Sequence, residues 1–478
     1  MRRGEFSLPA FPAWCSFNDV SFFDVHAEEL DGRGFGLVAD KDLVNDKDNV
    51  EIPTLLTIPR DLVLSAAAVE EYAKVDKNFR DLLEAAGHQS HRGNILLFLL
   101  MQLVLSSPDY QGHKGSLSPW TQYFSLLPAQ VPVPTMWTEA ELSCLRGTSL
   151  EAAVAAKLSA LTHEFDHVRS KCDDLPFWYD LLYQDELITV RDWVLLDALY
   201  RSRSLELPLS GESMVPCLDL ANHSQNAVAY FEENQKDEVG LLLRKGSAVK
   251  SGAEITIDYG QKKSAAEMVF SYGFLDPNTP AGSFVLPLEP MDDDPLAKAK
   301  LHIFGESPTL KVEDAEDGVA WSAPFVYLMC LNEEDGIQFG LLQENDGTRH
   351  LRLYWQEEDV ADRCADFETL IGDHELSPIF HLRAITVIME RISQQAETLE
   401  SNPAQPNLPG LVRAEILGTV SQLREAELDL MQRTLQALES KRDALLKNDR
   451  VVAYLGSMEA AQNEGLAAQS SNGEDDFS

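Results

Sequence analysis

Basic residues are scarce in this sequence. Its 478 residues include 39 Lys and Arg against 78 Asp and Glu, which gives a formal net charge of −39 at pH 7. Nucleic-acid binding depends on clustered Lys and Arg that contact phosphates. This balance therefore argues against a nucleic-acid partner and favours a basic one. An acidic surface that serves solubility alone is the other interpretation.

Closely spaced cysteines are absent as well. The six cysteines stand at positions 15, 144, 172, 217, 330 and 364, and no two have CxxC or CxC spacing. Common zinc fingers and ribbons need such pairs, so they are excluded, and nothing indicates a disulfide framework. A reducing compartment, the cytosol or the nucleus, is expected.

Long apolar runs are also missing. The longest covers residues 95–105 and is broken by Gln102. Spanning a bilayer takes about 20 apolar residues, so this run predicts a buried core helix and no membrane segment. In the N-terminal MRRGEFSLPAFPAW, prolines interrupt the apolar part before it could form the core of a signal peptide.

The pattern of apolar residues divides the chain into blocks. Residues 17–60 show short strand-like runs and turn glycines, whereas 61–200 place apolar residues at three- and four-residue spacing, which is typical of helices. Strand patterns return over 201–277. This order predicts one β domain that is interrupted by a helical insertion.

The remainder of the chain predicts a second, mainly helical domain over 296–450. A Pro- and Asp-rich stretch, LPLEPMDDDP, precedes it and has the composition of a linker. Two long helical patterns, 377–399 and 411–448, suggest a helical hairpin. The small, polar residues of 457–478 predict a disordered tail.

The motif HEFDH, at 163–167, has a chemical meaning on a helix. HExxH places two histidines one turn apart, with the glutamate as a base toward metal-bound water. The metzincin continuation needs Gly and His where this chain has Ser170 and Asp173. An amphipathic helix is the alternative. Its inward face would consist of Leu158, Leu161, Phe165 and Val168.

Five further segments gain meaning from their order. They are DGRGFGLVA at 31–39, SRS at 202–204, MVPCLDLANHS at 214–224, EITIDYG at 254–260 and MVFSYGF at 268–274. Singly, each has an ordinary explanation as turn glycines, turn-forming Asx residues, a loop histidine or strand aromatics. Their order and spacing make the joint case.

Together these segments resemble the SET-domain methyltransferases, specifically the branch of the RuBisCO large-subunit methyltransferase. The NHS and DYG elements, followed by YGF, carry the resemblance, and WTQYFSLLP at 120–128 supports the same branch. The resemblance implies an α+β fold. A SET β-fold with a knot-like core would be split by a helical insertion and followed by a mainly helical substrate-binding domain.

The resemblance also implies a cofactor and residue roles. S-adenosyl-L-methionine would be held by Arg33, Gly34, Phe35, Arg203, Asn222, His223, Tyr259 and Phe274. Tyr259 would be the catalytic residue, because its hydroxyl would orient the incoming nitrogen and contact the polarised methyl group. Asp219 and Tyr272 would border the acceptor channel. No metal is expected.

The activity that follows is protein-lysine N-methylation of a non-histone protein. The acidic surface suits a basic substrate, such as a ribosomal protein or a translation factor. Three alternatives stay open. They are protein-histidine methylation, a catalytically silent binding module with the SET fold, and an HExxH zinc metalloprotease.

Overall fold

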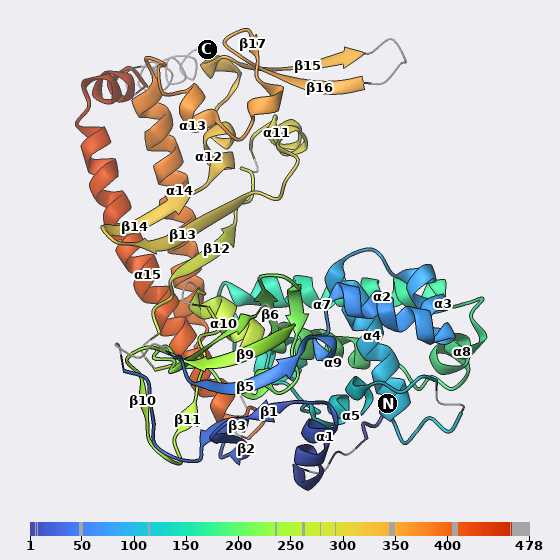
Figure 1. The fold of residues 1–478 in the computed structure, drawn as a ribbon. Coiled ribbons are helices and arrows are strands. Elements are labelled where there is room, and N and C mark those ends of the chain that lie inside the picture. Colours follow the sequence, from blue (N-terminus) through green and yellow to red (C-terminus); the bar gives the residue numbers. More distant parts are fainter. Residues whose placement is uncertain are drawn as a thin grey trace, which may run out of the picture.

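The computed structural model describes residues 1–460 apart from 5, 7, 47–50, 113–114, 235–236, 261–262, 278, 292, 344–348, 404–409 and 459. The predicted disordered tail, 457–478, lies almost wholly outside these residues. Figure 1 shows a lower body that holds the β domain and the helical insertion, and an upper C-terminal domain. The predicted α+β fold is confirmed.

The two β segments form shared antiparallel sheets, as expected for one interrupted domain. In the first sheet the order is β1 (Ser21–Phe22), β5 (Thr54–Pro59), β9 (Glu238–Leu243) and β8 (Ala229–Glu233). In the second it is β11 (Glu254–Ile255), β3 (Gly34–Ala39) and β2 (Val25–Leu30). Two strand pairs complete the domain, β4 (Leu43–Val44) with β10 (Ala248–Val249) and β6 (Ser204–Leu207) with β7 (Gly211–Met214).

The described residues of the insertion form helices joined by loops. Its helices are α2 (Ala66–Val75), α3 (Lys77–Ala86), α4 (His91–Ser106), α5 (Pro119–Leu126), α6 (Glu139–Ser143), α7 (Leu150–Lys171), α8 (Pro176–Tyr179) and α9 (Val190–Arg203). Side chains of Ser65, Asp76 and Ser90 cap the starts of α2, α3 and α4 by accepting backbone N–H groups. Residues 95–105 are all buried in α4, as predicted. Across the described residues, no helix combines the length and apolarity needed to cross a membrane.

A short helix precedes the β domain, and the sequence patterns did not predict it. Helix α1 (Phe11–Phe17) follows a 3₁₀ turn and has Pro12 in its first turn, where a missing N–H costs nothing. Its Phe11 and Trp14 are buried, and the Trp14 ring lies 5.1 Å from the ring of Tyr123. The prolines that break a signal-peptide core therefore start a helix that packs on the insertion.

The C-terminal domain contains more strand than the sequence predicts. Its sheets are β12 (Ser283–Pro287), β13 (Thr309–Ala315) and β14 (Gly318–Ser322), and β15 (Ile337–Gln343), β16 (Arg349–Trp355) and β17 (Glu358–Asp359). The expected linker is wrong at its start, because Leu286 and Leu288 are buried in this domain's core. Alternation in β12 puts Phe284 and Leu286 inside, and the prolines obscure that pattern in the sequence.

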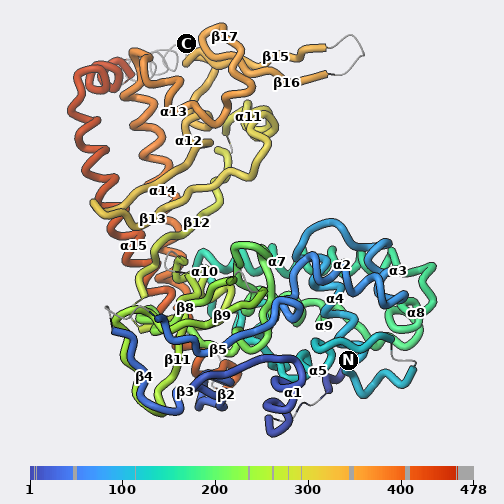
Figure 2. The backbone as a smooth tube through the Cα atoms, viewed as in Figure 1, coloured from blue at the N-terminus to red at the C-terminus, as the bar shows by residue number. Residues whose placement is uncertain are grey.

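Two long helices support these sheets, close to where the sequence places them. They are α14 (Ser377–Ser401) and α15 (Ala414–Leu446), which lie side by side in Figures 1 and 2. Three shorter helices complete the domain, α11 (Ala297–Phe304), α12 (Pro324–Met329) and α13 (Phe367–Leu370).

Helix α15 belongs to two hydrophobic cores. Its second half packs into the C-terminal domain, and its first half contributes to a separate cluster with the insertion and α10 (Ala265–Tyr272). That cluster consists of Trp137, Cys144, Leu145, Leu150, Val154, Ala265, Val269, Ile416, Val420 and Leu423. Polar contacts reinforce it, since Arg424 donates to the carbonyls of Cys144 and Arg146. The two parts of the molecule are therefore held together along one helix.

A buried carboxyl lies at this junction and predicts a pH dependence. Glu427 is fully buried and accepts hydrogen bonds from the backbone N–H and the hydroxyl of Ser149. Burial raises the pKa of Glu427 to about 7, above its unfolded value of about 4.5. Its contribution to stability is therefore complete below pH 4.5 and is lost as the pH rises to 7.

Replacement of Glu427 by Gln removes this titration. Between pH 5.5 and pH 8, the free energy of unfolding of wild type should fall by about 2 kcal/mol relative to that of Glu427→Gln. Denaturant unfolding at the two pH values measures this difference. Glu425→Gln, an exposed position on the same helix, should give a difference from wild type that does not change with pH. A constant difference for Glu427→Gln would contradict the assignment.

Candidate active site

Two loop segments lie side by side at the centre of the β domain. The N–H of Ile257 donates to the carbonyl of Asn222 at 2.9 Å, and Ser224 N–H donates to the carbonyl of Ile257 at 3.1 Å. A third bond runs from the Tyr259 N–H to Nδ1 of His223, at 3.1 Å. Because Nδ1 accepts, the imidazole is protonated at Nε2 when neutral, and Nε2 lies 3.6 Å from a carboxylate oxygen of Asp276. The predicted neighbours Asn222, His223 and Tyr259 are thus brought together.

Four rings gather around this pairing and form what we call the aromatic cluster. The Tyr259 ring centroid lies 4.6 Å from that of Tyr272 and 5.2 Å from that of His223. Phe274 completes the cluster, 6.1 Å from His223 and 6.3 Å from Tyr272. Gly273, with φ of +82°, ends α10 in the left-handed conformation and turns the chain between the last two rings.

The hydroxyl of Tyr259 is fixed and neutral. It donates to the carbonyl of Ala221 at 3.0 Å. Burial raises the pKa of Tyr259 far above its usual value. Burial, with a smaller effect of Asp258, raises the pKa of Tyr272 to about 12. Both phenols therefore keep their protons at neutral pH and act as polar, uncharged groups.

Glu254 connects the glycine-rich strand to the Asn222–His223 turn. Its carboxylate accepts from Asn222 Nδ2 at 2.7 Å and from the guanidinium of Arg33. Arg33 also donates to the carbonyl of His223 at 3.3 Å, and Asn222 Nδ2 donates to that of Phe35 at 3.3 Å. The sequence analysis did not single out Glu254, although it opens the EITIDYG segment.

The two glycines of this strand have different environments. A Cβ at Gly34 would meet nothing within 4 Å, and its φ of +70° explains the glycine. A Cβ at Gly36 would lie 2.3 Å from Leu30 Cδ1 and 3.1 Å from Asn222 Nδ2. Close approach to the Asn222 side chain is therefore a property of Gly36, which the sequence analysis left as a turn glycine.

Arg203, Asp219 and Tyr123 form a buried polar chain beside the aromatic cluster. Arg203 Nη1 donates to the backbone carbonyl of Asp219 at 2.8 Å and to its carboxylate at 3.1 Å. The Tyr123 hydroxyl donates to the same carboxylate and accepts from the N–H of Cys217 at 2.8 Å. Cys217 has a φ of +70°, a costly conformation for this residue type, and this hydrogen bond supports it.

The Asp219 carboxylate is used within the protein. Its side chain is 1% exposed, and burial raises its pKa, an effect that Arg203 and Tyr123 oppose. Asp219 thus positions Arg203 and the 217–219 turn. The sequence analysis missed Tyr123, whose segment WTQYFSLLP supported the family resemblance without any assigned role.

Two cavities adjoin the aromatic cluster. One of about 600 Å³ is lined by Arg203, Asp219, Tyr259 and Tyr272 among others, and we call it the tyrosine cavity. The other, of about 1,700 Å³, lies between the β domain and the C-terminal strands β12 and β13. Residues 258 and 260, with Lys263, border both cavities. The turn that carries Tyr259 therefore separates a small pocket from a large cleft.

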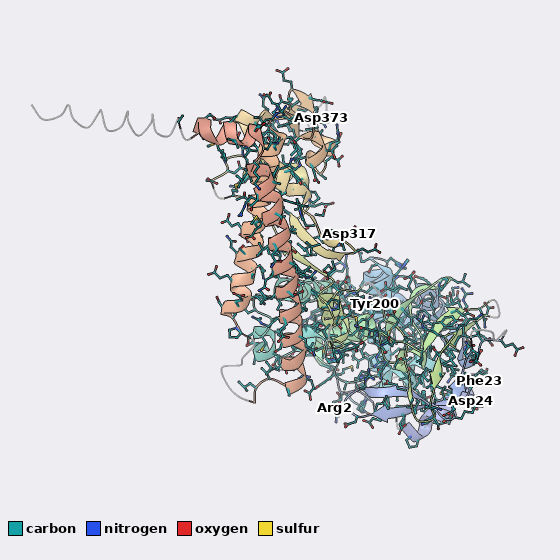
Figure 3. All side chains as sticks on the ribbon, turned by 90° about the vertical axis from the view of Figure 1, so that its left-hand side faces the viewer. Arg2, Phe23, Asp24, Tyr200, Asp317 and Asp373 are labelled. Carbon is teal, nitrogen blue, oxygen red and sulfur yellow. The ribbon has the colours of Figure 1, made fainter. Side chains whose placement is uncertain are left out.

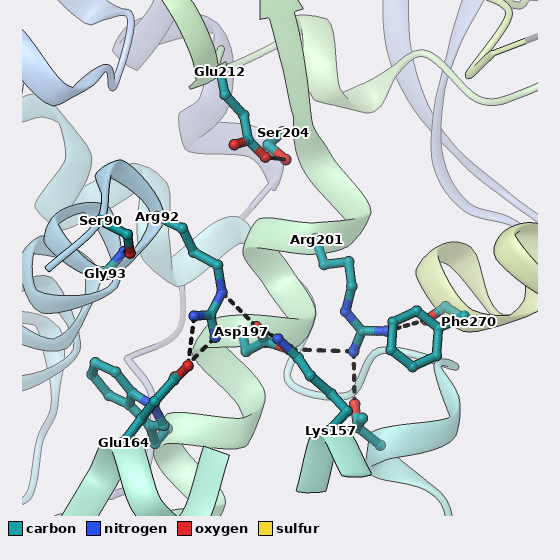
Figure 4. A network of polar contacts seen from close by, with 12 residues as sticks. Ser90, Arg92, Gly93, Lys157, Glu164, Asp197, Arg201, Ser204, Glu212 and Phe270 are labelled. Carbon is teal, nitrogen blue, oxygen red and sulfur yellow. Dashed lines mark hydrogen bonds and ion pairs between the residues drawn. The ribbon is translucent and has the colours of Figure 1, made fainter. Parts of the chain in front are cut away.

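The HEFDH motif lies on α7, as predicted, but its glutamate has another use. Glu164 accepts from both Nη atoms of Arg92, at 2.9 and 3.0 Å, and from the Trp193 ring N–H (Figure 4). The predicted inward face is confirmed, with Leu161, Phe165 and Val168 buried and Leu158 half-buried. In the part of the chain that the structure describes, no three His, Cys, Asp or Glu side chains form a group able to hold a metal ion.

Comparison with known proteins places this geometry in a family, although no family model matches the chain. SET domain-containing protein 8 of Schizosaccharomyces pombe is 28% identical over 411 residues, which cover 84% of this chain and 89% of that protein. The RuBisCO large-subunit N-methyltransferase of Pisum sativum is 28% identical over 286 residues, covering 57% of this chain and 52% of that protein. The chain is similar to SET-domain proteins of this branch over most of its length.

A solved structure shows the same fold along almost the whole of this chain. The SET domain of LSMT, crystallised with lysine and AdoHcy, superposes with a TM-score of 0.62 and 21% identity, covering 92% of each chain. The helical insertion and the C-terminal domain are included in this coverage. The resemblance drawn from the NHS, DYG and YGF segments is confirmed.

The buried chain from Tyr123 to Arg203 predicts a specific cost of mutation. Tyr123→Phe should lower the free energy of unfolding by about 2 to 3 kcal/mol, because it leaves one oxygen of the buried Asp219 carboxylate and the Cys217 N–H without a partner. Tyr72→Phe is the matched control, since the Tyr72 hydroxyl donates to one neutral carbonyl, of Ser116, and should cost about 1 kcal/mol. Denaturant unfolding measures both. Equal costs would contradict this assignment.

Proposed function

We propose that this chain is an S-adenosyl-L-methionine-dependent protein-lysine N-methyltransferase that acts on a non-histone protein. The observation that carries the proposal is the fixed, neutral Tyr259 hydroxyl beside the paired 222–224 and 257–259 segments, at the wall of the tyrosine cavity. The similarity to the SET domain of LSMT, crystallised with lysine and AdoHcy, supports it.

Arg203 in the tyrosine cavity and the residues of the adjoining 222–224 turn suit the cofactor. Arg203 Nε is buried without a hydrogen-bond partner in the structure, which fits a site that awaits a carboxylate. Carbonyl, amide and imidazole groups of Phe35, Asn222 and His223 offer polar contacts, and Phe274 offers an aromatic face. When bound, S-adenosyl-L-methionine supplies a methyl group on a positively charged sulfur.

Tyr259 and Tyr272 would prepare the acceptor amine. Their rings, 4.6 Å apart, provide a mostly apolar wall with two neutral hydroxyls. A lysine side chain placed there would lose hydration, and desolvation lowers the pKa of a lysine. A lower pKa favours the neutral amine, which has the lone pair that attacks the methyl group. The Tyr259 hydroxyl, held by the Ala221 carbonyl, would fix the direction of that nitrogen.

The substrate is proposed to be a basic protein, such as a ribosomal protein or a translation factor. The net charge of −39 favours a cationic partner, and the 1,700 Å³ cleft has room for a polypeptide segment. None of the six cysteines forms a disulfide, which suits a reducing compartment, and we propose the cytosol or the nucleus.

Tyr259→Phe separates cofactor binding from methyl transfer. The variant should bind S-adenosyl-L-methionine with a dissociation constant within about threefold of wild type, while methyl incorporation falls about 100-fold or more. Calorimetric titration and a radiolabel assay measure the two quantities. Tyr183→Phe is the matched control, because the Tyr183 hydroxyl also donates to one backbone carbonyl, that of Arg169, and it should leave both quantities unchanged. Unchanged transfer by Tyr259→Phe would remove Tyr259 from its role.

Gly36→Ala tests the glycine that contacts Asn222. The added methyl group would collide with Leu30 and crowd the hydrogen bond between Asn222 and Glu254, so the affinity for S-adenosyl-L-methionine should fall about tenfold or more, as measured by calorimetric titration. Gly240→Ala, on β9, is the control, because its Cβ would meet one atom, the Leu56 carbonyl oxygen, at 3.9 Å. Wild-type affinity in Gly36→Ala would exclude this part of the site.

The acceptor residue is decided by mapping modified sites. Cell lysate is incubated with the enzyme and isotope-labelled cofactor, and labelled peptides are sequenced by mass spectrometry. A methylated lysine that appears with wild type and is missing with Tyr259→Phe is the expected result. A labelled histidine would replace lysine in the proposal, and a chain that binds no cofactor would be a silent binding module.

A further inference from the structure

Two carboxylates stand opposite each other at the edge of the tyrosine cavity. Glu206 on β6 and Glu212 on β7 are direct cross-strand partners, both are exposed, and both line the cavity. Like charges in directly opposed positions destabilise a strand pair. Within the described residues, no ion pair with a cation is found for either, and the Ser204 hydroxyl donates to Glu212 at 3.5 Å.

The cations around the same cavity are already engaged. Arg92, Lys157 and Arg201 all bind the buried Asp197 carboxylate, at 2.6, 3.0 and 3.3 Å (Figure 4). Arg203 binds Asp219, and the Lys263 ammonium lies 5.7 Å from the Tyr272 ring centroid. These cations already have partners inside the protein, whereas no ion pair engages Glu206 or Glu212 in the part of the chain that the structure describes.

A buried hydroxyl beside this pair lacks a partner. Tyr200 on α9 is 2% exposed and lines the same cavity, and its hydroxyl has no hydrogen-bond partner within 3.5 Å, although the Glu212 carboxylate is a nearby acceptor. Figure 3 places it in the lower body of the molecule, within the region of the β domain and the insertion. The nearby charge of Glu212 adds to burial in raising the pKa of Tyr200, so the phenol is neutral. An unsatisfied buried hydroxyl is costly, and a ligand at this position would satisfy it.

We propose that Glu206, Glu212 and Tyr200 form a subsite for a lysine or arginine side chain that flanks the acceptor lysine in the substrate. The inference rests on the proposed function. It states that the enzyme recognises a basic residue next to the acceptor lysine in the substrate. A guanidinium or ammonium between the two carboxylates would relieve their repulsion, and its N–H groups would donate to the Tyr200 hydroxyl. The acceptor lysine would enter the same cavity and lie against Tyr259 and Tyr272.

Peptide binding tests the subsite without depending on catalysis. Fluorescent nonapeptides carry a central lysine in an alanine background, with arginine or glutamine at each flanking position in turn. Fluorescence anisotropy with the full chain at low salt should show one arginine position that binds about fivefold more tightly than its glutamine counterpart. In Glu206→Gln/Glu212→Gln this ratio should fall to about 1, and in Tyr200→Phe it should fall about twofold.

Two comparisons separate this role from a merely structural one. Glu232→Gln on β8, an exposed carboxylate that does not line the cavity, should keep the wild-type ratio. The double variant should melt at or above the wild-type temperature, because a repulsive pair is removed. A wild type without an arginine preference, or a double variant that keeps it, overturns the subsite. Anisotropy reports binding alone, so methyl transfer to the peptides is measured separately. Absence of methyl transfer to any peptide would contradict the proposed function and not the subsite.

Discussion

The site depends on the hydrogen bonds that hold residues 222–224 against 257–259. They bring together segments that are more than thirty positions apart, and they set which imidazole nitrogen of His223 carries the proton. The Tyr259 hydroxyl, the aromatic cluster and the walls of both cavities all take their positions from this pairing. His223 and Ile257 are buried, so loss of one of their bonds would leave an unsatisfied polar atom and not a solvated one.

The parts of the fold that follow from local pattern were predictable. Helical spacing identifies the insertion, and an apolar run broken only by Gln102 identifies α4 as buried. The short C-terminal strands were not, because five to seven half-exposed residues give a weak alternation that prolines further obscure. Helix α1 was not predicted for a related reason. Its proline stands in the first turn of the helix, whereas a proline in a sequence is more often taken as the end of a helix.

The candidate site divides in the same way. Residues inside the five segments could be assigned by resemblance, and the structure gathers them in one network. Tyr123, Glu254 and Gly36 could not, because their roles exist only through partners elsewhere in the chain. Tyr123 meets Asp219 across 96 positions, and Glu254 meets Arg33 across 221. HEFDH shows the converse, since Glu164 fits a catalytic pattern in sequence yet binds the guanidinium of Arg92 in space.

Helix α15 has a mechanical consequence for the large cleft. One side of the cleft belongs to the β domain and the other to the C-terminal domain, and α15 is anchored in the cores of both. Hinged enzymes close around a substrate by letting two lobes swing, but a continuous helix locked at both ends resists bending. The width of the large cleft is then fixed. Projecting loops and chain ends would be admitted by their thickness, whereas flat surfaces would be refused before any chemistry begins.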